Sequence, residues 1–285
     1  ADAAQVSSVQ AQAGSSVTVS SGCSLELNAV VIIPDPAFKA KLLAADVSNP
    51  IASLAANGSA PISYVKIDAN NDGEIQILEA LRIKYLDVSG IPNLNGGITN
   101  MKGIEAFVYL ESLNCSYNQV TNVDFEHNTN LYTLHCGNNQ LINLDVTYNR
   151  KLQTLYCNDN QLTSLDVSHN SELQDLRCEY NQLTSLVIGS IDIQTLYCNN
   201  NQLTSLDCST NRKLKTLYCE SNQLTTLIIR TSLNTSDPVY PWLQDLRCGN
   251  NQLTSLDITN NRSLGKLDCQ NNQLTSLGIM PIYLS

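Results

Sequence analysis

Ten cysteines are the side chains of this 285-residue chain with the widest choice of chemistry, because a thiolate can bind a metal ion or enter a disulfide. Eight of them recur at one position of a short repeated phrase, mostly at intervals of 21 residues. A disulfide framework joins distant points of a fold, whereas cysteines at one repeated position occupy one structural place. We therefore interpret the eight as small buried apolar residues without bridges. They are Cys115, Cys136, Cys157, Cys178, Cys198, Cys219, Cys248 and Cys269.

The other two cysteines differ from each other. Cys208 stands where other repeats have Val146 and Val167, so we expect it in the core as well. Cys23 follows a stretch that lacks the apolar run of a lipoprotein signal, and we interpret it as a free thiol.

A second group of residues has the spacing of a calcium-binding loop, D-x-[DN]-x-[DN]-G-x5-E, as in an EF-hand. Hard oxygen atoms at alternating positions can surround one cation, Gly73 permits the sharp turn, and Glu79 would bind with both carboxylate oxygens. The alternative is a solvated turn that caps a helix from Gln76 to Ile83, and the strand-like segment before the loop is not the helix that precedes an EF-hand loop. The candidate calcium ligands are Asp68, Asn70, Asp72, Glu74 through its carbonyl, and Glu79.

The residue before each repeated cysteine is frequently Tyr or Arg. These side chains bring large contact area and directed donors, and they are enriched at recognition surfaces. A structural alternative remains open, because Tyr is a good strand residue and Asp175 and Asp245 could simply neutralise the arginines two positions on. The candidate ligand-binding residues are Tyr156, Arg177, Tyr197, Tyr218 and Arg247.

One phrase, L-x-x-L-x-C-x-x-N-Q-L, recurs eight times, with Val120 and Ile193 in place of a leucine in two copies. It must position the eight cysteines and the Tyr and Arg residues beside them. A repeat of this length indicates a solenoid of stacked coils. Alternation directs Leu155 and Cys157 inward and Tyr156 outward, as in a strand. The phrase resembles that of the leucine-rich repeat, with Cys at the third apolar position. The resemblance implies an α/β-type solenoid, a right-handed superhelix whose parallel, concave β-sheet carries the Tyr and Arg side chains.

The rest of each repeat predicts how the coil closes. Asn160 and its equivalents should form a buried ladder whose side-chain amides satisfy backbone groups. The return leg through Leu162, Leu165 and Val167 is too short for a full helix, so the convex side should be mostly non-helical. It also repeats an outward acid, which could hold cations or form a solvated face. These acids are Asp124, Asp145, Asp166, Asp207 and Asp257.

Composition divides the chain into three parts. Residues 1–33 form a linker or extended N-terminal segment, because they begin with a stretch rich in Ala, Ser, Gln and Val. Residues 34–82 form a small helical N-terminal cap that includes the calcium-type loop, with Asp35 and Pro36 beginning its first helix. Residues 83–285 form the solenoid, with one irregular and eight regular repeats. An insertion at about 231–242 contains the only tryptophan, Trp242, and is a candidate for recognition or for plugging the interrupted repeat.

The segments "IPDPAFKAKLLA", "IDANNDGEIQILEA" and "ITNMKGIEAFVYLESLNC", in that order, resemble the N-terminal cap of secreted leucine-rich repeat proteins of Bacteroidetes-type bacteria. That resemblance implies an extracellular or cell-surface protein from which a signal sequence has been removed. It also implies no catalytic activity, since none is general to the group.

Charge and motifs narrow the function further. The net charge of −10 argues against a nucleic-acid partner, and no apolar run is long enough to span a bilayer. The three histidines are scattered, and no nucleophile elbow or phosphate-binding glycine loop is present, so we expect a non-enzyme that requires no cofactor. We expect a monomer. Two functions remain: a module that binds a protein or glycan ligand through the concave face, and a structural stalk or spacer.

Overall fold

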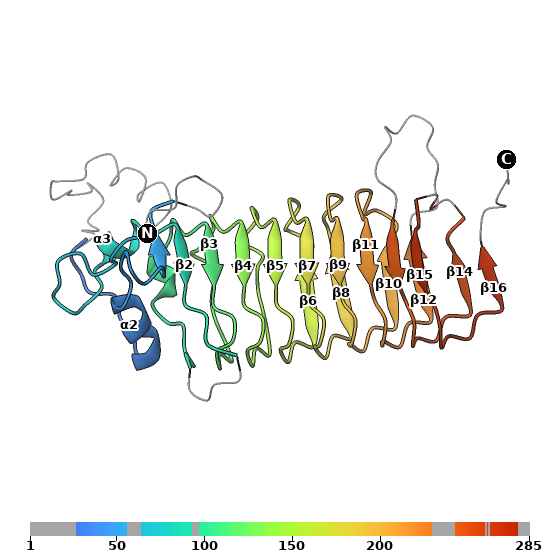
Figure 1. The fold of residues 1–285 in the computed structure, drawn as a ribbon, viewed down its shortest axis with the longest axis horizontal. Helices are drawn as coiled ribbons and strands as arrows, with labels where there is room; N and C mark the ends of the chain where they lie inside the picture. The colour runs from blue at the N-terminus through green and yellow to red at the C-terminus, as the bar shows by residue number, and fades with distance from the viewer. Residues whose placement is uncertain are drawn as a thin grey trace, which may run out of the picture.

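In the computed structural model, coils stack one behind another along the long axis, beginning at a cap at the N-terminal end (Figure 1). The structure describes residues 27–55, 64–92, 97–229, 243–259, 261 and 263–278. Cys23, the insertion at 231–242 and most of the predicted linker lie outside the described residues.

One ten-stranded sheet runs the length of the solenoid, with one strand from the cap and one from each coil. Neighbouring strands are parallel and pair leucine to leucine, as Leu155 pairs with Leu176, except for the antiparallel first pair. The strands in spatial order are β1 (Ala52–Ser53), β2 (Tyr85–Asp87), β3 (Ser112–Asn114), β4 (Thr133–His135), β5 (Thr154–Tyr156), β7 (Asp175–Arg177), β9 (Thr195–Tyr197), β11 (Thr216–Tyr218), β13 (Asp245–Arg247) and β15 (Lys266–Asp268). The irregular repeat supplies β2, and each of the eight regular repeats supplies one of the eight strands that follow it in this sheet. We call the outward side of this sheet, predicted to be concave, the sheet face.

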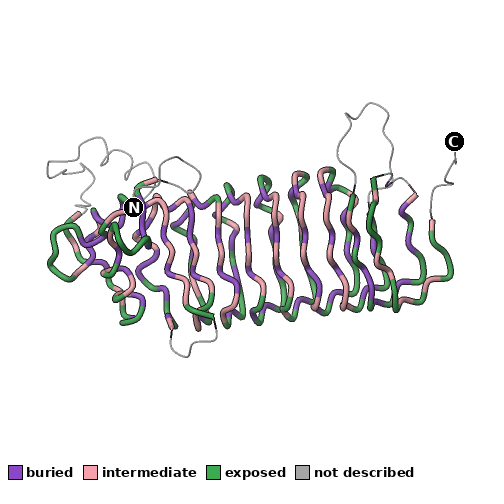
Figure 2. Tube along the Cα trace, in the orientation of Figure 1, coloured by how far each residue is buried: buried purple, intermediate pink, exposed green. Residues whose placement is uncertain are grey.

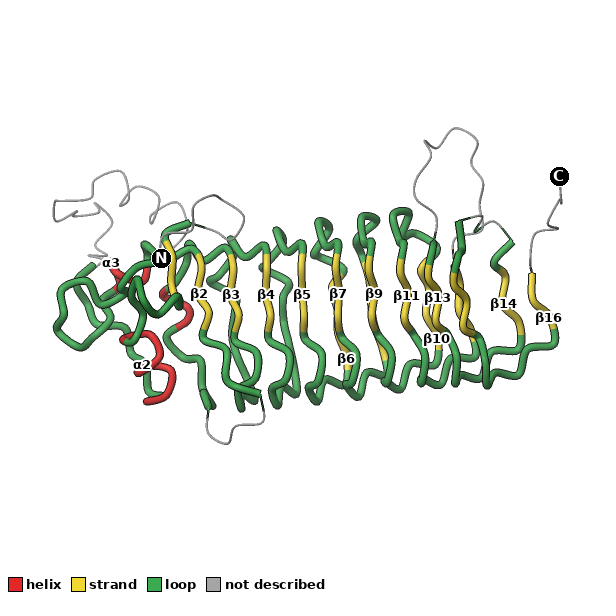
Figure 3. Tube along the Cα trace, viewed as in Figure 1, coloured by secondary structure: helices red, strands yellow, loops and turns green. Residues whose placement is uncertain are grey.

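The opposite side of the solenoid is built from short strands and turns, which confirms the predicted non-helical return legs (Figure 3). Some return strands pair in twos: β6 (Ser164–Val167) with β8 (Ser185–Ile188), β10 (Ser205–Cys208) with β12 (Thr226–Ile229), and β14 (Ser255–Asp257) with β16 (Ser276–Gly278). In the described part of the solenoid, the only helical element is the short 3₁₀ helix η1 (Ile104–Ala106).

The core runs between the two sides, where buried and exposed residues alternate along each coil (Figure 2). Leu155 and Cys157 from the strand pack there with Leu162, Leu165 and Val167 from the return leg. The repeated cysteines are free thiols and all are buried except the half-buried Cys269. Burial raises the pKa of the Cys157 thiol well above its ordinary value, so the reactive thiolate is suppressed. The cysteines therefore act as core packing, as does Cys208.

An asparagine in each coil bonds it to the coil before it, as predicted. The Asn160 side-chain amide donates to the carbonyls of Cys136 and Cys157, both at 3.1 Å, while its oxygen accepts from the Leu141 N–H at 2.9 Å. Each amide thus satisfies backbone groups of two coils at the place where the chain leaves the sheet. The equivalent residues are Asn118, Asn139, Asn181, Asn201, Asn222, Asn251 and Asn272.

A second polar ladder, which the sequence analysis did not identify, lies where the chain returns to the sheet. The Asn170 amide donates to the carbonyls of Val146 and Asn149, each at 2.9 Å. In the coil that is one residue shorter, Ser190 takes this place, and its hydroxyl donates to the Leu173 carbonyl at 2.7 Å. The other members are Asn128, Asn149 and Asn211.

The outward aspartates of the return legs shape turns. The Asp166 carboxylate accepts a hydrogen bond from the N–H of Ser168, two residues on, at 2.8 Å. Hydrogen bonds from the residue two positions on lower the pKa of Asp145, Asp166, Asp207 and Asp257. Asp124 accepts the same bond from Glu126. The acidic column therefore has a structural role in closing each coil.

One carboxylate ties the cap to the solenoid. Asp35 begins helix α2 (Pro36–Leu43) as predicted, accepting from the Phe38 N–H at 2.9 Å. Its other oxygen accepts from the Thr99 N–H, in the first coil, at 2.8 Å. Burial disfavours its charged form, but hydrogen bonds to the carboxylate outweigh burial and lower the pKa of Asp35.

The cap contains a strand as well as helices, and this strand closes the edge of the sheet. The segment after Ser48 supplies the antiparallel strand β1. Covering the edge of β2 in this way removes an unpaired row of backbone groups. The described end of the predicted linker is extended and attached to the cap, since the Val31 N–H donates to the Ile75 carbonyl at 2.7 Å.

The asparagine ladder yields a test of stability. Asn160→Ala should lower the free energy of unfolding by about 2 kcal/mol or more, because the buried Leu141 N–H loses its partner and two carbonyls each lose one hydrogen bond. Asn158→Ala, two residues away, removes a side chain bonded only to Asp159 and should cost less than about 0.5 kcal/mol. Urea unfolding followed by circular dichroism measures both. Equal losses in the two variants would show that the ladder does not stabilise the coils.

Candidate functional site

The five predicted ligand-binding residues lie in one row across the sheet face. Tyr156 on β5 stands beside Arg177 on β7, which stands beside Tyr197 on β9. Tyr218 on β11 and Arg247 on β13 continue the row. His135 on β4 extends it by one strand, in register with Tyr156. All are half-buried except the more exposed Arg247.

The six side chains are stacked face to face. The rings of His135 and Tyr156 are 4.3 Å apart and 2° from parallel, and those of Tyr197 and Tyr218 are 4.4 Å apart and 4° from parallel. The Arg177 guanidinium lies between two tyrosines, with Cζ 4.4 Å from the Tyr156 centroid and 5.1 Å from that of Tyr197. Arg247 closes the row 4.1 Å above the Tyr218 ring. We call this row the planar stack.

The spacing of the sheet explains the planar stack. Parallel strands lie about 4.8 Å apart, close to the separation of stacked aromatic rings. Side chains at one position of successive in-register strands therefore overlie one another. Each ring or cation–π contact contributes about 0.5–1 kcal/mol, which together limit the rotamers that the row can adopt.

Two aspartates on the neighbouring position hold the stack. The Tyr156 hydroxyl donates to Asp175 at 2.6 Å, and the Tyr218 hydroxyl donates to Asp245 at 2.9 Å. Burial and these hydrogen bonds raise the pKa of each tyrosine to about 12. The Arg177 Nε lies 3.8 Å from Asp175, so the aspartate that the sequence offered as a neutralising partner also positions a tyrosine.

The calcium-type loop has two buried carboxylates that are already hydrogen-bonded. Asp68 is 5% exposed and accepts from the N–H groups of Asp72 and Gly73, both at 3.2 Å. Glu79 is 7% exposed and accepts from the Ala69 N–H at 2.6 Å and the Gln76 N–H at 3.0 Å, where it caps helix α3 (Ile77–Ala80). Gly73 has the positive φ of 81° that the turn requires.

Three of the five predicted calcium ligands share one depression. Asn70, Asp72 and Glu79 line a common depression of about 430 Å³. The Glu74 side chain is turned away and pairs with Lys39 at 2.6 Å, which leaves its carbonyl for the role predicted from the sequence. Oxygen donors of this kind suit calcium, although Asp72 now accepts from Gln76 at 2.7 Å and would have to exchange that bond. Calcium binding here stays a prediction.

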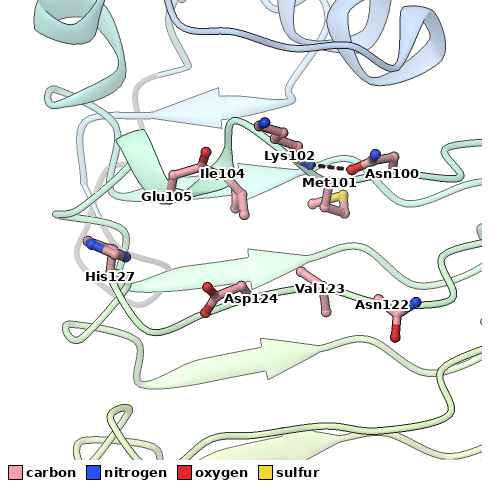
Figure 4. A pocket seen from close by; sticks show the side chains of 9 residues that line it. All are labelled: Asn100, Met101, Lys102, Ile104, Glu105, Asn122, Val123, Asp124 and His127. Carbon is pink, nitrogen blue, oxygen red and sulfur yellow. Dashed lines mark hydrogen bonds between the residues drawn. The ribbon is translucent and has the colours of Figure 1, made fainter.

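No catalytic arrangement is found in the part of the chain that the structure describes. There, no three or more His, Cys, Asp or Glu side chains are grouped so that they could hold a metal ion. A depression of about 530 Å³ on the return side places His127 near Asp124, Glu105 and Lys102 (Figure 4). The hydrogen bond drawn there joins the Lys102 N–H to Asn100, and no hydrogen bond is found between His127, Asp124 and Glu105.

No protein-family model and no curated protein sequence matches this chain, but solved structures do. The functional domain of InlJ from Listeria monocytogenes, which includes a cysteine ladder, is 30% identical with a TM-score of 0.62 over 88% of this chain and 52% of that chain. Internalin C2 from the same bacterium is 22% identical with a TM-score of 0.58 over 87% of this chain and 95% of that chain. The leucine-rich effector YopM from Yersinia pestis is 24% identical with a TM-score of 0.54, over 69% of this chain and 52% of that chain.

The chain has the leucine-rich repeat fold. Its similar structures include bacterial leucine-rich repeat proteins, and it spans about half the length of the InlJ and YopM chains. The leucine-rich repeats here carry their cysteines in a ladder, as the InlJ domain does. No helix among the described residues is both long enough and apolar enough to cross a membrane.

Sequence reasoning found the planar stack but missed part of its surroundings. The five residues were found because the repeated cysteine fixes which neighbours point outward. His135 shares their position and could have been included on that signal. Two glutamates one position after the cysteine, Glu179 and Glu220, were missed because a Glu beside a turn is ordinarily solvated. In the folded chain they are half-buried, and burial raises the pKa of both.

Proposed function

We propose that this leucine-rich repeat protein is a non-catalytic interaction module that binds a protein ligand through the planar stack on the sheet face. The observation that carries the proposal is the stack itself: six planar side chains, from His135 to Arg247, held by mutual contacts on a rigid sheet. Aromatic and arginine side chains dominate the energetics of protein interfaces. A surface whose rotamers are limited before binding loses little conformational entropy when a ligand arrives.

The geometry favours a protein over a glycan. A sugar ring packs on the open face of an aromatic side chain, but the faces of these tyrosines are covered by their neighbours in the stack. What the stack presents outward is a row of ring edges and guanidinium edges, which suits the polar and apolar groups of a polypeptide. A glycan ligand is therefore the second choice.

We also propose that the protein acts outside a bacterial cell. The similarity to the InlJ domain of Listeria monocytogenes and the resemblance of the cap to those of secreted leucine-rich repeat proteins support this location. Fractionation of the producing cell tests it: recovery in the cytoplasmic fraction alone would contradict export.

Variants of the planar stack test the binding proposal. A protein ligand selected on the wild-type chain should bind the Tyr156→Ala, Tyr197→Ala, Tyr218→Ala triple variant about 30-fold more weakly or worse, a loss of about 2 kcal/mol. Arg177→Lys should also weaken binding, because lysine keeps the charge but cannot stack as a plane. Surface plasmon resonance measures the dissociation constants.

The control for these variants is Tyr148→Ala, which removes an exposed tyrosine from the return side. Binding should be unchanged in this variant. Full affinity in the triple variant would refute binding through the planar stack. If the folded protein selected no ligand at all, the structural stalk or spacer would become the better account.

We propose in addition that the loop of residues 68–79 binds calcium through Asp68, Asn70, Asp72, the Glu74 carbonyl and Glu79. The spacing of the oxygen donors supports this, as does the depression that Asn70, Asp72 and Glu79 share. The role of the ion would be to stabilise the cap, since the loop leads directly into α3.

Calcium binding has an internal control. Calcium should raise the thermal unfolding midpoint of the wild type, and a chelator should reverse the rise, because an ion that binds only the folded state stabilises it. Asp72→Ala should abolish the rise because it removes a side-chain ligand, whereas Glu74→Gln should keep it because only the carbonyl of Glu74 is used. Scanning calorimetry measures the unfolding midpoints of the wild type and both variants. An unchanged midpoint of the wild type in millimolar calcium would contradict the calcium site.

A further inference from the structure

A row of three polar residues runs beside the planar stack, one position after the cysteines. Glu179, Asn199 and Glu220 follow the strands β7, β9 and β11, so they occupy three neighbouring coils. Backbone hydrogen bonds hold them in register: the Tyr180 N–H donates to the Asn199 carbonyl at 3.1 Å, and the Asn200 N–H donates to the Glu220 carbonyl at 3.0 Å. With a strand spacing of about 4.8 Å, the backbones of the two glutamates are about 10 Å apart, with Asn199 between them.

Two of the three side chains in this row have a buried polar atom without a partner. Asn199, which lies between them, is 8% exposed. The Oε2 atoms of Glu179 and Glu220 are also buried, and within the described part of the chain neither has a hydrogen-bond partner. Buried polar groups are paired in the great majority of cases, because an unpaired one costs about 1–3 kcal/mol. Two such exceptions, on either side of Asn199, indicate a place that is completed by something outside the chain.

The charges around this row favour a cation. Glu179 lies near Asp159, Asp175 and one positive group, Arg177. Glu220 has the equivalent surroundings, with Asp245 and Asp268 near it and Arg247 as the positive group. Each glutamate thus adds to a local excess of negative charge.

The chemistry also narrows which cation fits. Among the described residues, the carboxylates do not form a group that could hold a metal ion. A Lys ammonium or Arg guanidinium carries several donors and can bond to carboxylate and amide oxygens at once.

We propose that Glu179, Asn199 and Glu220 form a subsite for a Lys or Arg side chain of the protein ligand. The subsite rests on the proposed function, in which that ligand lies along the planar stack, and it adds the charge that the ligand must carry there. The Asn199 amide oxygen and the two carboxylates accept hydrogen bonds from the cation. A ligand with an acidic residue at this point is rejected.

A small probe tests the subsite without the natural ligand. N-acetyl-lysine methylamide and N-acetyl-arginine methylamide, titrated into the isotope-labelled protein, should produce saturable NMR shifts at the amides of Glu179, Asn199 and Glu220. The uncharged N-acetyl-norleucine methylamide is the control ligand. The Glu179→Gln, Glu220→Gln double variant should bind the cationic probes about tenfold more weakly or worse. Glu126→Gln, which removes one negative charge at an exposed place on the return side, should bind them as the wild type does.

The outcomes separate this subsite from the proposed function. Absence of saturable shifts, equal shifts with the norleucine probe, or unweakened binding by the double variant would each overturn the subsite. If that happened while planar-stack variants still weakened the selected protein ligand, the binding face would stand and only the cation subsite would be lost. If the probes bound at the subsite but planar-stack variants did not weaken binding of the selected protein ligand, the cation subsite would stand and binding through the planar stack would be refuted.

Discussion

The hydrogen bonds of one asparagine per coil are the constraint on which the rest of the molecule depends. The Asn160 amide bonds to backbone groups of its own coil and of the coil before it, and its equivalents repeat the arrangement along the solenoid. These bonds fix where each coil leaves the sheet. Every strand therefore begins in the same register as its neighbour, and a side chain at one repeat position lies beside its equivalent about 4.8 Å away.

That register turns a repeated sequence position into a continuous surface. Apolar positions stack into a continuous core in which the cysteines are inert packing. Outward positions stack as well, and there the chain places planar groups from His135 to Arg247. A stack of this kind has little freedom left to lose. Beside it lie the unpaired Oε2 atoms of Glu179 and Glu220, from which we infer that the ligand carries a positive charge.

The sequence predicted most of this because the repeat carries its own geometry. Leu155 and Cys157 determine that Tyr156 points outward, and the spacing of the cysteines determines which residues stand beside it. The repeat does not reveal how far a side chain is buried, so Glu179 and Glu220 read as solvated residues near a turn. The repeat also does not reveal which side chains form hydrogen bonds with each other. That Asp175 accepts a hydrogen bond from the Tyr156 hydroxyl is known only from the structure. The loop at Asp68 is a local motif, and it predicts candidate calcium ligands from their spacing alone. It does not predict the hydrogen bonds that these ligands make within the folded protein, such as the one that Asp68 accepts from the Asp72 N–H.

The planar stack should exist before any ligand arrives, and the ligand should lie against its outward edge. Crystal structures of the free protein and of its complex with a selected protein ligand measure both properties directly. The expected result is that the Tyr197 and Tyr218 rings are parallel and 4.4 Å apart in both structures, with the ligand seated across β5 to β13. Rings that are turned apart in the free protein, or a ligand bound on the return side, would contradict the account.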